Sequence, residues 1–395
     1  MRLSALAPLA LSLPLAACRF DFDPVRAQPM DAAPEAPLSL LPCGAPPQFS
    51  TALPAAGSGA AAVTVSSLAT AAFDTGYYLF ATDSAGDVHG FSMSFDAGQL
   101  APGIINVPVL SGATGPVAAV ATPDGPLAAI EYGRPDPAGT RLIPLDAQLA
   151  SRGATQMDAA WYSIDSAIAG TPDGALAFLG VQDSGAVAAK RVSSGGADLG
   201  ASHLVIDASE KASLATVTAA RSGYLVTWAT NSPQINQVRA EIIDPQMSVS
   251  TPPTTINPNA MFDGADPRAA YAASADRFLF AWWIKTSTSD ELWVSLRDGQ
   301  LVEQHAIRLT TTGTQPRVVA GNDDFLVAWK DTSGNTTSGI AAARVRFDGT
   351  TSSLVVSGNG GKALAWDLAT RAGQPALIWI ESATMLNAWF DPLCN

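Results

Sequence analysis

The stretch DFLVAW (residues 324–329) decides the fold, because it recurs along the chain. Close copies are GYLVTW (223–228), RFLFAW (277–282) and PALIWI (375–380), and weaker copies are YYLFAT (77–82), GPLAAI (125–130) and GALAFL (174–179). The leucines that align in these seven segments are separated by 48, 49, 49, 54, 47 and 51 residues. An internal repeat of this length indicates one supersecondary unit that is used again and again.

Each unit has the pattern of short β-strands. In the sixth unit, apolar or alternating runs follow one another between polar turns: HAIRLT (305–310), PRVVAG (316–321), FLVAWK (325–330) and GIAAARVRF (339–347). Four strands in about 40–50 residues are typical of one blade of a β-propeller. The sequence therefore predicts an all-β chain with a seven-bladed β-propeller over residues 43–395. Six or eight blades stay open because the second and third units are degenerate, and residues 208–220 are compatible with one or two helical turns.

A second marker follows most copies, namely an apolar run that ends in Asp, often with Leu or Met three or four residues later. The aspartates are Asp96, Asp146, Asp244, Asp298, Asp348 and Asp391, and the third unit departs from the marker with Ser193-Ser194-Gly195. Recurrence in one frame predicts a turn-capping role and not catalysis. Trp228, Trp282 and Trp329 also share one frame position, where other units carry Ile or Leu, which predicts packing between blades.

The seventh unit lacks a fourth strand, because its third strand, MLNAWF (385–390), nearly ends the chain. A spare strand-like segment, QFSTALP (48–54), precedes the first unit. An uncovered sheet edge is a liability, so we expect residues 48–54 to supply the last blade's outer strand and to close the ring. Cys43 and Cys394 flank these two strands where other blades have a turn, and we therefore predict a disulfide between them.

The chain begins with MRLSALAPLALSLPLAAC (1–18), which reads as an export signal: Arg2, then an apolar run too short to span a membrane. Leu15-Ala16-Ala17-Cys18 resembles a bacterial lipoprotein signal. This resemblance implies a signal peptide over 1–17, cleavage before Cys18 and acylation of its thiol, for example with palmitate, so that membrane lipid is a partner. Residues 18–42 would be a flexible Pro/Ala-rich tether. Arg19 is not the Asp of an inner-membrane retention signal, which favours the outer membrane of the cell envelope.

Together, the signal motif and the "YLVxW … xFDG" blade pattern resemble predicted bacterial β-propeller lipoproteins. That resemblance implies a fold and a cellular location, and it implies no activity. The net charge of −13 argues against nucleic-acid binding, which needs clustered Lys and Arg. The sequence contains no G-x-S-x-G, H-E-x-x-H, Walker A or G-x-G-x-x-G motif. We assign no catalytic residue, metal site or cofactor, and we interpret His89, His203 and His305 as surface or edge residues.

Binding is expected at one rim of the disc, where the loops between second and third strands vary in sequence. The candidate residues there are Asp83, Asp87, Glu131, Arg134, Asp136, Trp283, Lys285, Asp290, Lys330, Asp331 and Glu381, with Arg268 and Arg317 at the channel mouth. The leading hypothesis is a lipid-anchored module that binds a protein or glycan. A carbohydrate-active enzyme that uses Glu131, Asp136, Asp290 or Glu381, and a purely structural envelope component, are the alternatives.

Peptide mass spectrometry of the unreduced protein, isolated from membranes, tests both cysteine hypotheses. We expect an acylated N-terminal peptide that starts at Cys18 and a cross-linked pair that contains Cys43 and Cys394. A disulfide that closes so long a loop stabilises the folded chain by up to about 5 kcal/mol. Free thiols at residues 43 and 394 in the native protein would contradict the predicted disulfide, and an unmodified Cys18 would contradict the predicted anchor.

Overall fold

A computed structural model shows that the described part of the chain consists of β-strands and the turns between them, with no helix. The described residues are 48–52, 65–74, 76–83, 85–96, 99–101, 107–110, 113–132, 139–156, 161–171, 174, 176–182, 186–207, 212–221, 223–230, 237–257, 266–333, 339–355, 365–382 and 385–390. The chain divides into Met1–Ala36 and Pro37–Asn395, and all described residues belong to the second unit. Cys18, Cys43 and Cys394 lie outside the described residues.

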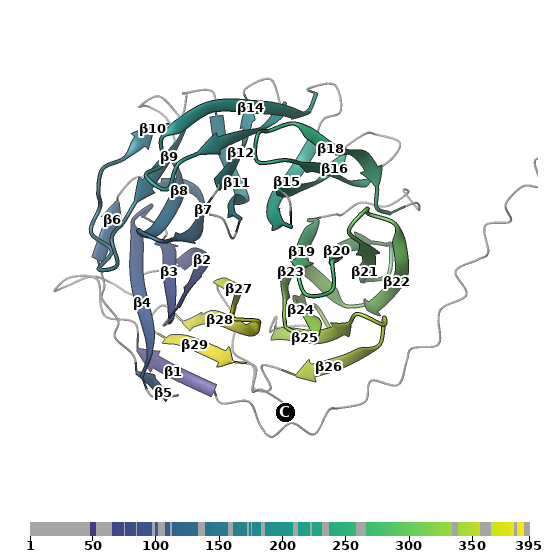
Figure 1. Ribbon diagram of the computed structural model, residues 1–395. Coiled ribbons are helices and arrows are strands. Elements are labelled where there is room, and N and C mark those ends of the chain that lie inside the picture. Colours follow the sequence, from purple (N-terminus) through teal and green to yellow (C-terminus); the bar gives the residue numbers. More distant parts are fainter. Residues whose placement is uncertain are drawn as a thin grey trace, which may run out of the picture. The chain divides into compact units, whose positions relative to one another are not determined.

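Within the described residues, the strands pair into seven antiparallel sheets (Figure 1). The first sheet contains β2 (Val65–Phe73), β3 (Gly76–Asp83), β4 (Val88–Asp96) and β5 (Gln99–Ala101), with β6 (Val107–Leu110) also paired to β4. The second contains β7 (Ala113–Thr122), β8 (Gly125–Tyr132), β9 (Gly139–Pro144) and β10 (Thr155–Gln156). The third contains β11 (Trp161–Gly170), β12 (Leu176–Gln182), β13 (Val187–Val192) and β14 (Asp198–Ile206).

The remaining four sheets follow the same inner-to-outer order. The fourth contains β15 (Ala212–Ala220), β16 (Gly223–Thr230), β17 (Val238–Ile243) and β18 (Val249–Thr255). The fifth contains β19 (Arg268–Ala272), β20 (Arg277–Lys285), β21 (Asp290–Asp298) and β22 (Glu303–Thr310). The sixth contains β23 (Gly313–Ala320), β24 (Asp324–Asp331), β25 (Gly339–Arg346) and β26 (Thr351–Val355). The seventh contains β27 (Ala365–Arg371), β28 (Gln374–Ser382), β29 (Met385–Phe390) and β1 (Gln48–Ala52).

The sheets are arranged as a β-propeller, with their first strands around a central axis (Figure 1). Each inner strand contacts the next in the order β2, β7, β11, β15, β19, β23 and β27, and β27 contacts β2. The buried apolar side chains of the described residues gather in seven clusters, and each cluster joins two neighbouring sheets. The repeated segment supplies much of this core, because its aligned leucines Leu79, Leu127, Leu225, Leu279, Leu326 and Leu377 are fully buried.

The seventh sheet contains strands from both ends of the described chain. Strand β1 pairs antiparallel with β29, from Gln48 opposite Trp389 to Ala52 opposite Met385. The five residues of β1, which begin the spare segment 48–54, therefore occupy the outer position of the seventh sheet, as predicted. On its other side, the seventh sheet packs on the first through a cluster that includes Leu79, Phe91 and Ile378.

Asp146, Asp244, Asp298 and Asp348 cap turns, as the shared frame of the recurring aspartates predicts. Asp391 and the side chain of Asp96 lie outside what the structure describes. Asp298 Oδ1 accepts hydrogen bonds from the backbone amides of Gln300 at 3.0 Å and Val302 at 2.9 Å, and Asp146 and Asp244 each accept two equivalent bonds. The apolar residue three positions after each of these aspartates has a positive φ and is buried: Leu149 (63°), Met247 (66°) and Leu301 (63°). The turn therefore aims one large side chain into the core.

The third unit makes the same turn with different residues. Ser193 Oγ accepts a hydrogen bond from the Ala197 amide at 3.0 Å, which replaces one of the bonds of the aspartate. Gly196 takes the left-handed position with φ 78°, where glycine is unstrained. The third unit therefore keeps the geometry of the turn although its residues differ from those of the other units.

The three tryptophans pack between sheets, as predicted. Trp228 lies with side chains of the third sheet, Trp282 with the fourth and Trp329 with the fifth, and all three are buried. Full burial of a large apolar side chain contributes about 1.5–3 kcal/mol. These residues are therefore part of the contacts that hold neighbouring blades together.

The helical turns suggested for residues 208–220 are not present where the structure describes this stretch. Residues 212–220 form β15, whose Thr218 pairs with Leu225 of β16. The ladder of backbone hydrogen bonds and burial between sheets outweigh intrinsic helix propensity, which tertiary packing overrides even for alanine, the best helix former. Across the described residues, no helix is long and apolar enough to cross a membrane.

We predict that Asp298→Ala lowers the free energy of unfolding by about 1–2 kcal/mol, because two backbone amides lose their acceptor. Denaturant-induced unfolding, followed by tryptophan fluorescence, measures this loss. Asp298→Asn is the matched control, since its amide oxygen can still accept both bonds. An equal loss in both variants would contradict the capping role.

Candidate functional site: the central cavity

The inner strands surround a cavity of about 300 Å³. Most of the wall is small and apolar, with alanine and valine from β7, β15, β19 and β23. Because each inner strand is an edge strand of its sheet, its backbone groups that face the axis have no partner strand. The wall therefore offers backbone donors and acceptors as well as side chains.

Charged residues interrupt the repeat at two adjacent positions of the inner strands. Each aligned leucine pairs with one residue of the inner strand, which gives the seven inner strands a common numbering. The residues two places before this paired residue are Leu68, Ala118, Ile168, Thr216, Arg268, Arg317 and Trp366. The residues one place before it are Ala69, Ala119, Ala169, Val217, Ala269, Val318 and Asp367. All charged residues at these positions belong to the fifth, sixth and seventh sheets, which are consecutive around the axis.

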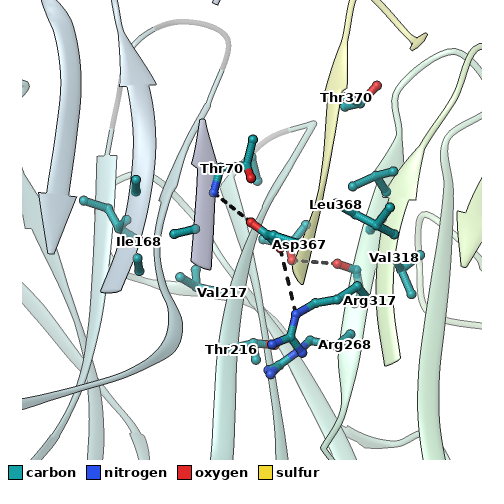
Figure 2. A pocket seen from close by; sticks show the side chains of 18 of the residues that line it. Thr70, Ile168, Thr216, Val217, Arg268, Arg317, Val318, Asp367, Leu368 and Thr370 are labelled. Carbon is teal, nitrogen blue, oxygen red and sulfur yellow. Dashed lines mark hydrogen bonds and ion pairs between the residues drawn. The ribbon is translucent and has the colours of Figure 1, made fainter. Parts of the chain in front are cut away.

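The charged side chains form one connected group, of which Figure 2 shows Arg268, Arg317 and Asp367. Asp266 lies just before β19, and its Oδ1 is 2.8 Å from Arg268 Nη2. Its Oδ2 is 3.9 Å from Arg317 Nη1, and Arg317 Nε is 3.9 Å from Asp367 Oδ1. Two positive and two negative groups therefore meet, and their formal charges cancel.

Arg317 and Asp367 are the group's most accessible pair, each with a side chain that is 19% exposed, whereas Arg268 is 5% exposed. The Arg317 guanidinium lies over the Trp366 ring, with Cζ 5.5 Å from the ring centroid. Asp367 Oδ2 accepts a hydrogen bond from the Thr70 amide at 2.8 Å, across the boundary between the seventh and first sheets. Packing and bonding thus hold both side chains in place at the cavity wall.

Hydroxyl groups line the same cavity. Within the described residues, the buried Oγ1 atoms of Thr70, Thr216 and Thr370 make no hydrogen bond. A buried hydroxyl without a partner costs about 1–3 kcal/mol, so such groups are usually satisfied by a ligand or water. Tyr271 also lines the cavity but donates to Asp276 Oδ1 at 2.7 Å; burial and this carboxylate raise the pKa of the Tyr271 phenol.

The structure places the two predicted channel residues, Arg268 and Arg317, in the cavity wall. The other described rim candidates do not line the cavity. Asp290 and Asp331 tie neighbouring loops together, because Asp290 Oδ2 accepts from Thr332 and Asp331 Oδ1 accepts from Thr312. Lys285 is exposed, and Trp283 and Lys330 are half-buried. Arg134 and Asp136 lie outside the described residues, and for Glu381 only its place in β28 is described.

The Asp83 carboxylate accepts hydrogen bonds from the loop that follows it and contacts His89. Its Oδ1 accepts from the amides of Ala85 and Asp87, and its Oδ2 is 2.9 Å from His89 Nε2. Burial pushes the pKa of Asp83 upward, but the hydrogen bonds from His89, Asp87 and Ala85 outweigh burial and hold the pKa below its ordinary value. His89 is therefore a buried partner and not the surface or edge residue that the sequence suggested.

Glu131 stands apart from the charged group. It is half-buried near the end of β8, and burial raises the pKa of its carboxyl group. His203 is 2.7 Å from Glu241 Oε1, a pair that links the third and fourth sheets. In the described part of the chain, no three His, Cys, Asp or Glu side chains gather in a way that could hold a metal ion.

Sequence reasoning missed Asp367, Asp266 and Trp366. Asp367 could have been found from the repeat, because the six equivalent residues are all alanine or valine. That comparison needs the register of the inner strands, which the degenerate units obscure. Asp266 precedes its strand and has no counterpart in the repeat, so only the folded chain brings it to the two arginines.

No protein-family model matches the sequence, and no significant relative was found among curated proteins. Among solved structures, BBS1N in complex with ARL6DN is similar over 81% of this chain and 88% of that chain, with 12% identity and a TM-score of 0.50. An ancestral GH74 enzyme is similar over 84% of this chain but 48% of its own, with 11% identity and a TM-score of 0.51. The Dos1 propeller gives 11% identity and a TM-score of 0.49 over 83% of this chain and 92% of that chain. At such low identity, the first two similarities concern the fold alone.

We predict that Asp83→Asn destabilises the protein most above about pH 4 and least at lower pH. A carboxyl group whose pKa is lowered by folding stabilises the native state above its unfolded pKa, and this contribution is lost as the pH falls through the lowered value. Urea unfolding at pH 5 and pH 2.5 measures the difference from wild type. Asp87→Asn is the control, and a deficit from Asp83→Asn that does not shrink at pH 2.5 would sink this interpretation.

Proposed function

We propose that the protein is a lipid-anchored envelope protein whose β-propeller is a binding module for a protein or glycan. One observation carries this proposal, namely the charged group at the cavity, where Arg268, Arg317 and Asp367 replace the small or apolar residues of the repeat. A part that served only structure would have no need to break its symmetry at a solvent-accessible cavity. Fixed polar groups in a rigid concave wall are typical of ligand sites.

We propose further that the seven sheets are seven blades of a closed ring. The pairing of β1 with β29, the contact of β27 with β2 and the shared core of the first and seventh sheets support this closure. The proposed Cys43–Cys394 disulfide would join the two strands that meet in the last blade. A closed ring keeps the cavity wall rigid, since no blade has a free face.

The anchor is proposed from the first 18 residues. An acylated Cys18 would hold the protein on a membrane, because each buried CH₂ contributes about 0.8 kcal/mol. Residues 18–42 would then separate the propeller from the lipid. We propose that the membrane is the outer membrane. The candidate residues on the loops, such as Trp283 and Lys285, would extend the contact with a large partner beyond the cavity.

An enzyme that hydrolyses glycosidic bonds is the weaker alternative. Such enzymes pair a neutral carboxylic acid with a carboxylate at one site. Of the described residues that line the cavity, Asp367 alone carries a carboxyl group, and it lies 3.9 Å from Arg317 Nε. Glu131 has a raised pKa but does not line the cavity. The ancestral GH74 enzyme is similar in fold over 48% of its own chain, and this similarity gives no substrate for the present chain.

A pull-down tests the binding function. We expect the full chain, immobilised in detergent, to retain a specific envelope protein or polysaccharide, and the double variant Arg317→Met/Asp367→Asn to retain about tenfold less. Arg308→Met/Glu291→Gln is the matched control, because this pair on the fifth sheet also joins an arginine to a carboxylate at 3.3 Å. If no envelope component is retained by the folded wild-type chain, the proposed function is wrong.

A further inference from the structure

We propose that the central cavity binds one neutral sugar residue, such as the terminal residue of a glycan. This inference rests on the proposed binding function and narrows it from a protein or glycan to a neutral glycan end. It follows from the charge balance, the hydrogen-bonding groups and the size of the cavity.

Charge balance selects a neutral ligand. The cavity group contains Arg268 and Arg317 against Asp266 and Asp367, so its formal charges already cancel. An anionic or cationic ligand would leave one unbalanced charge in a largely buried site, which is costly. The net charge of −13 also disfavours the approach of anions over longer distances.

Hydrogen-bonding capacity selects a ligand with several hydroxyl groups. Asp367 presents an acceptor and Arg317 a donor, with 3.9 Å between Oδ1 and Nε. A sugar hydroxyl both donates and accepts, so adjacent hydroxyls can donate to the carboxylate and accept from the guanidinium at the same time. The hydroxyls of Thr70 and Thr216, together with the strand edges that face the axis, offer further partners of both kinds.

Size limits the ligand to about one ring. A volume of about 300 Å³ is at the lower end of small-molecule pockets. The alanines of the wall, such as Ala119 and Ala219, have small side chains that leave the cavity open and offer no polar group. Arg317 and Asp367 would therefore orient a ligand. A longer glycan would therefore enter with its end and leave the rest outside the cavity.

Saturation-transfer difference NMR with the full chain in detergent tests this inference. The probes are glucose, galactose, mannose and xylose, with glucuronate and glycine as charged and zwitterionic competitors. We expect at least one neutral sugar to bind, and we expect Arg317→Met and Asp367→Asn each to weaken that binding about tenfold or more, because each removes a charge-assisted hydrogen bond.

Arg308→Met is the matched control, because Arg308 also lies by a carboxylate and over a tryptophan, with Cζ 6.0 Å from the Trp293 ring centroid, but does not line the cavity. Ala119→Leu fills the cavity without a change of charge and should also abolish binding. It serves as the second variant if a charge variant does not fold, as judged by thermal unfolding.

Three results would overturn the inference: no neutral sugar binds the folded wild type, only glucuronate or glycine binds, or a sugar binds equally to Ala119→Leu. None of them alone refutes the proposed function, because retention of an envelope protein in the pull-down would leave the binding module intact. Failure of the pull-down together with a positive NMR result would limit the ligand to a free sugar.

Discussion

Each sheet of the described chain buries its apolar faces only by packing against the neighbouring sheets, and the rest of the structure depends on this constraint. Each apolar cluster in the described chain combines two adjacent sheets, including the first and the last. Full burial of a large side chain contributes about 1.5–3 kcal/mol, and a whole domain has a net stability of roughly 5–15 kcal/mol. A few large side chains exposed at one opened interface would therefore remove much of the net stability.

The shared turn chemistry serves this interlocking of sheets. An aspartate holds the turn after the third strand, and the following left-handed residue directs Leu149, Met247 or Leu301 into the core. The third unit reaches the same geometry with Ser193 and Gly196. The side-chain oxygen and the tolerance of positive φ are thus required at these positions, whereas the identity of the residue is not.

At the cavity, single units depart from the residue pattern that the other units share. Six of seven equivalent residues at one layer are alanine or valine, and the seventh is Asp367, which bonds to the Thr70 amide of the next sheet. Arg317 is held between Trp366 and two carboxylates. A group that both ties adjacent blades together and faces a cavity can have a structural and a binding role at once, and the charge balance of the group favours neutral ligands.

The sequence alone determined the β-propeller, the frame of the repeat, the capping aspartates, the packing of Trp228, Trp282 and Trp329 and the partner of the segment at 48–54. These follow from local periodicity and from the need to cover sheet edges, which a single chain records directly. It also placed Arg268 and Arg317 on inner strands. Only the tertiary structure decided that Asp266 and Asp367 meet these arginines, that Asp83 turns inward to His89, and that residues 212–220 form a strand. Asp367 meets Arg317 across two sheets, Asp83 meets His89 through the turn between β3 and β4, and residues 212–220 are held by a ladder of backbone pairing. The spacing of residues along a sequence does not encode the distances between side chains that fold together in these ways.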